Sequence, residues 1–262
     1  MIIVFLCSVQ ESSEKINRKL LAQLDSTRIT GRIWEIKNQH QDQILQAHSY
    51  PQILILRKTR ELHRPIIDRA ENIYELGSFL LISYSLPNKP EKIRRTIQRI
   101  LARTPSIRLR RGIYLFPEAR YRSMYAKSVH LIEPYKAFES VRKQGGKITI
   151  LSRLEIVHPH GIQILETLKS QYLDRLDKIC TRSSELRQEI KSHPNLERSK
   201  IQINELRSSY RRTHEVIEAM NHIFNQSLDV HQALQRTYKH ILQTRKQTDE
   251  YIQTRLIQMN EK

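Results

Sequence analysis

Three hydrophobic patterns divide the 262 residues of the chain. Residues 1–77 alternate short apolar runs with stretches of helical spacing. Residues 78–157 place apolar strands around two amphipathic segments, and residues 158–262 carry apolar side chains at intervals of three and four almost throughout. Short apolar runs between turn residues are typical of strands, and intervals of three and four are typical of amphipathic helices. The pattern predicts an α+β protein whose last part is helical.

The first part, residues 1–77, reads as strands and helices in turn. The expected strands are Ile2–Ser8, Ile29–Ile36 and Ile53–Arg57, and the expected helices are Gln10–Leu24, Gln41–His48 and Pro65–Leu76. This order, with Pro51 just before the third strand, resembles the thioredoxin-like fold. At the place of that family's CxxC the chain has Val9-Gln10-Glu11-Ser12. The resemblance therefore implies a thioredoxin-like domain without dithiol chemistry.

The second part, residues 78–157, has the order strand, helix, two strands, helix and strand. The expected elements are an apolar strand Phe79–Pro87, a helix Glu91–Arg103, strand material over Ser106–Glu118, a helix near Lys136–Lys143 and a strand Lys147–Leu154. This order predicts a ferredoxin-like domain, in which helices cover an antiparallel sheet.

Ser106–Glu118 alternates apolar and polar residues, except that Arg111 falls on the apolar side directly before Gly112. A glycine inside a strand often marks a bulge or a tight bend, where the side-chain register changes. We therefore expect two short strands, with Arg111 outside the core. Tyr114 and Phe116 either stack nucleobases or are buried, and burial is favoured.

The third part, residues 158–262, predicts long antiparallel helices, as a bundle or a coiled coil. Breaks are expected at His193-Pro194-Asn195 and Asn225-Gln226-Ser227, because proline and polar turn residues end helices. Helices with thin apolar stripes pack against each other or against a partner chain. His158-Pro159-His160 is interpreted as a linker rather than a metal site.

The basic charge of the chain is concentrated in its middle part. The net charge is +18, and residues 78–157 contribute +12 of it, from seventeen Lys and Arg against five Glu. Residues 1–77 contribute +2 and residues 158–262 contribute +4. A localised excess of this size indicates a polyanionic partner.

Basic residues at helical spacing form a candidate phosphate-binding ridge opposite the apolar face of the expected helix Glu91–Arg103. The alternative is an ordinary solvated helix face. The expected nucleic-acid-binding residues are Lys92, Arg95, Arg99, Arg103, Arg108, Arg110, Arg120 and Arg122. Arginine and lysine position phosphates without reading sequence, so backbone contact is the expected mode.

The stretch FLLISYSLPNKPEKIRRTIQRILARTPSIRLRRGIYLFPE resembles the amino-terminal domain of the chromate-resistance regulators (ChrB) and the middle domain of the phenylacetate-pathway repressors (PaaX). The motif pairs an apolar strand ending in Tyr84-Ser85-Leu86-Pro87 with a basic helix, and then a Gly-aromatic strand ending at Pro117. The resemblance implies a transcription regulator. No winged-helix domain is recognisable in residues 1–77, and this is a departure from PaaX.

The same fold unit is found in the small CRISPR-adaptation subunits, some of which cleave nucleic acid with an Asp at the end of the first strand. Here Ser85 occupies that position. A serine does not hold a divalent cation as a carboxylate does, so cleavage by that route is not favoured.

Other classes of function lack their signatures. Cys7 and Cys180 form no CxxC, so neither a disulfide framework nor a zinc site is expected, and the protein is expected to be cytoplasmic. No apolar run approaches the roughly 20 residues of a membrane span, and MIIVFLCSV is interpreted as a strand and not a signal peptide. No nucleophile elbow, phosphate-cradling glycine loop or HExxH motif is present. No cofactor and no metal are expected.

The sequence therefore predicts a non-enzymatic nucleic-acid-binding regulator that acts as a homodimer, without a membrane partner, with DNA favoured over RNA. Two alternatives stay open. One is a metal-dependent nuclease of the CRISPR-adaptation type, and the other is a helical scaffold or assembly protein.

Overall fold

The protein mixes helices and strands, as the sequence predicts. The computed structural model describes residues 2–6, 24, 26–30, 33–36, 53–68, 70–71, 73–118, 128–157, 160–192, 196–225 and 227–260. The chain forms two compact units. The first contains residues 1–168 with 219–226, and the second contains residues 169–218 with 227–262.

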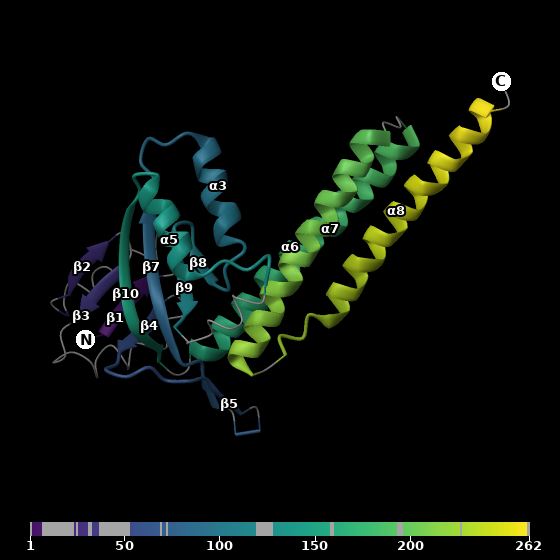
Figure 1. The fold of residues 1–262 in the computed structure, drawn as a ribbon. Helices are drawn as coiled ribbons and strands as arrows, with labels where there is room; N and C mark the ends of the chain where they lie inside the picture. The colour runs from purple at the N-terminus through teal and green to yellow at the C-terminus, as the bar shows by residue number, and fades with distance from the viewer. Residues whose placement is uncertain are drawn as a thin grey trace. The chain divides into compact units, whose positions relative to one another are not determined.

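The first unit contains an eight-stranded antiparallel sheet (Figure 1). Its strands, in chain order, are β1 (Ile2–Leu6), β2 (Thr27–Thr30), β3 (Ile33–Ile36), β4 (Ile53–Lys58), β7 (Ser78–Ser85), β8 (Ile107–Arg110), β9 (Ile113–Pro117) and β10 (Lys147–Ile156). Their spatial order is β2-β3-β1-β4-β10-β7-β9-β8. The pairing of β4 with β10 therefore joins strands from both sides of the expected 77/78 boundary. The three-domain division stays a prediction.

β1 lies between two antiparallel neighbours, β3 and β4. The expected single strand Ile29–Ile36 is two strands, because β2 pairs back on β3 and places Thr30 opposite Ile33. In the expected thioredoxin-like order a helix connects β1 to the next strand, and strands joined by such a crossover are parallel. The observed neighbours of β1 are both antiparallel. The expected helices Gln10–Leu24 and Gln41–His48 lie outside the described residues, apart from Leu24. Cys7 also lies outside them.

The expected helix Pro65–Leu76 is wrong. The segment is a small hairpin of β5 (Ile66–Asp68) and β6 (Ile73–Glu75). The Asp68 carboxylate accepts hydrogen bonds from the backbone N–H groups of Ala70 (2.8 Å) and Glu71 (3.3 Å), which is a local turn that competes with helix formation. Flanking β-branched and aromatic residues then favour strands.

Residues 78–157 place two helices on one face of β10-β7-β9-β8. These are α3 (Glu91–Leu101) and α5 (Pro134–Lys143), which contact each other (Figure 1). The core beneath them is formed by Leu80, Ile82, Leu86, Ile97, Leu101, Tyr114, Phe116, Ala137, Phe138 and Val141. Because alternate strand residues point to opposite faces, Phe79 lies on the other face, where its ring meets Phe224 at 6.4 Å between centroids.

The last part of the chain is three long helices, as expected. They are α6 (His160–Ser192), α7 (Leu196–Phe224) and α8 (His231–Asn260). None of the described helices reaches the length and apolarity needed to cross a membrane. The linker interpretation is wrong for His160, which is the first residue of α6 and is 2% exposed.

The second unit has an apolar core with a buried polar row beside it. Ile179, Leu186, Ile190, Ile203, Leu206 and Ile241 form that core. In the polar row, the Ser183 and Thr244 hydroxyl oxygens lie 2.7 Å apart, and Cys180 Sγ lies 3.3 Å from Thr237 Oγ1. Buried hydroxyl pairs stabilise only when aligned, so the row favours one register of α6 against α8.

Candidate nucleic-acid interface

The ridge on α3 consists of Lys92, Arg95 and Arg99, all exposed. The helix begins after Pro90, with Glu91 in its first turn, where a negative charge is favourable. Its opposite face buries Ile97 and Leu101. This packing fixes which side of α3 faces solvent.

The ridge carries more positive charge than its own ion pairs neutralise. Arg95 Nε lies 3.3 Å from Glu91 Oε1, a solvent-exposed pair that contributes at most about 1 kcal/mol. Among the described residues, no hydrogen bond or ion pair involves the Lys92 or Arg99 side chain. The two side chains therefore reach solvent with their charges available.

Arg103 does not belong to this ridge. The helix ends at Leu101, two residues before the expected end. The Arg103 guanidinium donates hydrogen bonds to the backbone carbonyls of His130 (2.7 Å) and Val129 (3.1 Å). Its side chain anchors the segment before α5, so we assign it a structural role.

The β8–β9 hairpin carries three more expected or neighbouring arginines. Its turn is Arg111-Gly112, and Gly112 has φ +79°, a backbone conformation that favours glycine. The pairing register shifts between Arg108 and Arg110. Arg111 is exposed and lies in the turn between two short strands, as expected, whereas the shift of pairing register lies before Gly112 and not at it.

The position of β8 explains its arginines without a ligand. β8 is the last strand of the described sheet, and short, charged edge strands resist pairing with another chain. Arg108 and Arg110 are exposed and both make further interactions within the protein. They therefore carry less weight for nucleic-acid binding than the α3 ridge does. Arg120 and Arg122 lie outside the described residues.

The aromatic residues of β9 are buried, which is the alternative that the sequence favours. Tyr114 is 6% exposed and Phe116 is 0% exposed. Phe116 meets Phe138 edge-on at 5.2 Å, and Tyr114 stacks on Tyr84 at 6.1 Å. These rings pack the sheet against α5, so they offer no platform for nucleobases.

A pocket of about 320 Å³ lies beside the ridge. It is lined by Tyr84, Ser85, Leu86, Pro87, Arg94, Gln98, Arg111 and Gly112. Burial raises the pKa of Tyr84, and its neighbour Tyr114 raises it further, against the opposing charges of Arg108 and Arg111. The Tyr84 hydroxyl is therefore uncharged near neutral pH. No sequence pattern indicates this pocket, because its residues come from three separate segments, which are the end of β7, α3 and the β8–β9 turn.

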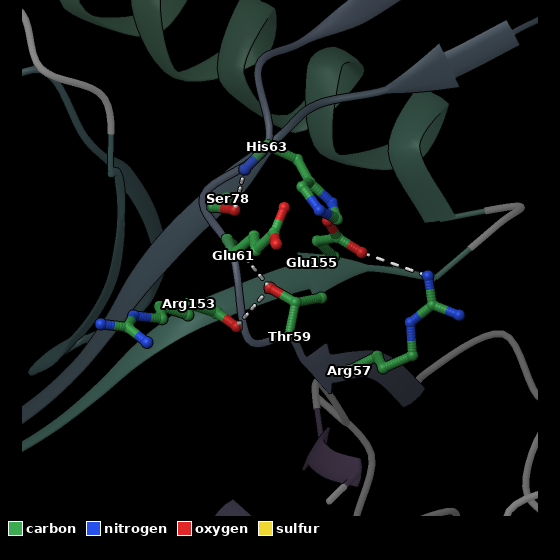
Figure 2. Close-up of polar contacts among 7 residues, drawn as sticks. All are labelled: Arg57, Thr59, Glu61, His63, Ser78, Arg153 and Glu155. Carbon is green, nitrogen blue, oxygen red and sulfur yellow. Dashed lines mark hydrogen bonds and ion pairs between the residues drawn. The ribbon is translucent and has the colours of Figure 1, made fainter.

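A second polar cluster lies where β4 meets β10 (Figure 2). Glu155 accepts a hydrogen bond from Arg57 at 3.1 Å and also contacts His63 Nδ1. The residues drawn are Arg57, Thr59, Glu61, His63, Ser78, Arg153 and Glu155. In the sequence this segment is the charged stretch RKTRELHR, residues 57–64, and its pattern predicts no function. Through these contacts Glu155 of β10 links Arg57 of β4 and His63, so the cluster connects the two strands beyond their backbone pairing.

The same junction contains a strained residue. Arg153 has φ +56°, within a register shift of β10 between Leu151 and Leu154. Its backbone N–H donates to Glu118 at 2.5 Å, and its carbonyl accepts from the Thr59 N–H at 2.9 Å. Burial raises the pKa of Glu118, against the lowering effects of the Arg153 N–H and of the Arg153 and Lys58 charges.

The position of Ser85 agrees with its place in the sequence motif. It is an exposed residue that ends β7 and lines the pocket. Within the described ranges, no group of three or more His, Cys, Asp or Glu side chains is placed to hold a metal ion.

Comparison with known proteins identifies no relative of this chain. No family model, curated protein or solved structure matches it.

Proposed function

We propose that this protein binds nucleic acid through its middle part, with the exposed ridge of α3 contacting the phosphate backbone. The observation that carries the proposal is the ridge itself. Lys92, Arg95 and Arg99 share one exposed helix face, and the one ion pair that these side chains make among the described residues joins Arg95 to Glu91. Like charges held together in this way favour a polyanion that relieves their repulsion.

The fold assignment of residues 78–157 as ferredoxin-like is part of the proposal. Its support is the chain order β7-α3-β8-β9-α5-β10, combined with the spatial strand order β10-β7-β9-β8. The resemblance to ChrB and PaaX rests on the sequence motif alone. From it comes the proposed role as a transcription regulator. The cytoplasmic location, the homodimer and the preference for DNA over RNA are proposed together with that role. The thioredoxin-like assignment of residues 1–77 stays a prediction, and the antiparallel pairing of β1 does not favour it.

Binding across a salt series tests the proposal. Duplex DNA, single-stranded DNA and structured RNA are titrated with the full chain, and with the triple variant Lys92→Gln, Arg95→Gln, Arg99→Gln. For duplex DNA the slope of log affinity against log salt falls by about 0.9 for each phosphate that the protein no longer neutralises. We expect a slope lower by roughly two to three, with weaker binding at every salt concentration.

A matched variant removes the same charge elsewhere. Lys191, Lys200 and Lys239 are exposed lysines of the second unit, and their change to Gln also lowers the net charge by three. We expect this control to bind like the parent protein. Equal losses of affinity in the two triple variants would mean that diffuse charge binds the polyanion. The ridge would then have no specific role.

A further inference from the structure

The pocket beside the α3 ridge has the properties of a phosphate site. Its walls come from the end of β7, from α3 and from the β8–β9 turn. Its volume of about 320 Å³ lies at the lower end of the range for small-molecule sites, roughly 300–1,000 Å³. It is therefore large enough for one small group and not for an extended ligand.

Two guanidinium groups line the pocket, and no carboxylate of the described part of the chain does. Arg94 donates from Nε to the Lys89 carbonyl and from Nη2 to the Leu86 carbonyl, both at 3.2 Å. These bonds fix the plane of its guanidinium, and Nη1 has no partner among the described residues. Arg111, in the β8–β9 turn, supplies the second charge. A planar guanidinium matches the oxygens of a phosphate.

The walls of the pocket are held in place before any ligand binds. The Tyr84 N–H donates to the Gly112 carbonyl at 2.8 Å, which ties the Arg111-Gly112 turn to the end of β7. Arg94 ties the loop after β7 to α3 through its two carbonyl contacts. Preorganised donors lose less entropy on binding, so they increase affinity.

The pocket and the ridge adjoin on one helix. Gln98 of the pocket lies three residues after Arg95 of the ridge, and residues at this spacing are neighbours on a helix surface. A strand that crosses the ridge therefore passes close to Gln98, a lining residue of the pocket. Uncharged Tyr84 and Gln98 add polar atoms without repelling an anion.

We propose that this pocket binds one phosphate group of the nucleic-acid strand that the α3 ridge contacts. The inference rests on the proposed function, and it adds a specific anchor point for the strand. Arg94 and Arg111 hold the phosphate oxygens, and Gln98 lines the pocket next to the ridge.

The variant that tests the pocket is Gln98→Glu. Gln98 is exposed and glutamate is a good helix former, so the helix is kept. The new carboxylate lies four residues after Arg94, where it pairs with that guanidinium and competes with a phosphate. Arg111→Gln removes the other charge. Gln188→Glu makes the same charge change at an exposed position of the second unit and is the control.

Two measurements separate the inference from the proposed function. In the first, inorganic phosphate and a nucleoside monophosphate are titrated into the ¹⁵N-labelled full chain. We expect the Gly112 amide resonance to shift, and the shift to be absent in Gln98→Glu but kept in Gln188→Glu. In the second, we expect nucleic-acid affinity to fall about tenfold or more in Gln98→Glu and in Arg111→Gln, since each change disrupts a hydrogen bond to a charged group.

The outcomes differ in what they overturn. If nucleic acid binds, but neither pocket variant weakens it and neither phosphate probe shifts Gly112, the pocket inference is wrong and the proposed function stands. If a phosphate probe shifts Gly112 and nucleic acid does not bind at any salt concentration, the proposed function is wrong. The phosphate in the pocket is then that of a free small molecule.

Discussion

Replacing Gly112 by alanine tests how the β8–β9 turn is held. Gly112 has φ +79°, and a Cβ built on it would lie 2.6 Å from the carbonyl oxygen of Tyr84. That oxygen is backbone, so a side-chain rotation cannot move it away. Relief requires the turn to move from β7, which breaks the hydrogen bond from the Tyr84 N–H to the Gly112 carbonyl.

The magnitude follows from two separate costs. An alanine in the left-handed region costs about 1–2 kcal/mol. Breaking or distorting the Tyr84–Gly112 hydrogen bond costs a further ~1 kcal/mol, so we expect Gly112→Ala to lower the free energy of unfolding by about 2–3 kcal/mol. Gly145 is a matched control, because its φ is +69° but its Cβ would meet only the flexible Lys89 side chain, with Nζ at 3.2 Å. Gly145→Ala therefore has the first cost without the second.

The fluorescence of the single tryptophan of the chain reports on the unfolding of the sheet that contains β7 and β9. Trp34 lies on β3, in the same eight-stranded sheet as β7 and β9. Its fluorescence in a urea titration gives the stability of both variants under equal conditions. Equal destabilisation of Gly112→Ala and Gly145→Ala would refute the reasoning, since it would mean that the close approach to Tyr84 has no energetic effect.

Three further predictions concern other parts of the protein. Arg103→Gln removes the hydrogen bonds to the His130 and Val129 carbonyls. It should lower the free energy of unfolding by about 1 kcal/mol and leave the salt slope of nucleic-acid binding unchanged. A lower slope would mean that Arg103 contacts the nucleic acid together with the ridge. The raised pKa of Glu118 means that its carboxyl binds a proton more readily in the folded protein than in the unfolded chain. The free energy of unfolding should therefore fall as pH rises from about 4.5 through the folded-state pKa. Urea unfolding of Glu118→Gln at several pH values should lack this fall, and identical pH profiles for the variant and the parent protein would contradict the prediction. Thr244→Val removes the hydroxyl paired with Ser183. It should lower the free energy of unfolding by about 1 kcal/mol more than Thr248→Val does, because the Thr248 hydroxyl donates within its own helix. Unfolding followed by circular dichroism of the helices measures both variants, and equal losses would show that the Ser183 contact contributes nothing.

The local pattern of the sequence was enough to predict most elements from residue 78 onward. Strands and helices there follow periodicity, and Gly112 marks the turn of the hairpin as expected. Spacing alone cannot distinguish a solvated arginine from one that donates to distant carbonyls, as Arg103 does. Its partners, His130 and Val129, lie 27 and 26 residues away.

The remaining errors come from competing local and non-local interactions. Pro65–Leu76 has helical spacing, but the Asp68 turn and β-branched neighbours favour a hairpin. The pairing of β4 with β10 depends on contacts between residues about a hundred positions apart, such as Leu56 with Ile156, and no periodicity encodes such a contact. The pocket beside the α3 ridge is not predictable from the sequence for the same reason, since Tyr84, Arg94 and Arg111 become neighbours only in the folded chain.

The contact between β4 and β10 has a consequence for biosynthesis. β4 is completed at Lys58, but its partner residues Leu154–Ile156 are made almost a hundred residues later. Until then the apolar strand β4 has one unpaired edge, and unpaired edges promote association with other chains. Such long-range strand pairing is also slow to form. Release of nascent chains that end before β10 should therefore yield aggregates, whereas chains that include β10 can close the sheet and stay dispersed.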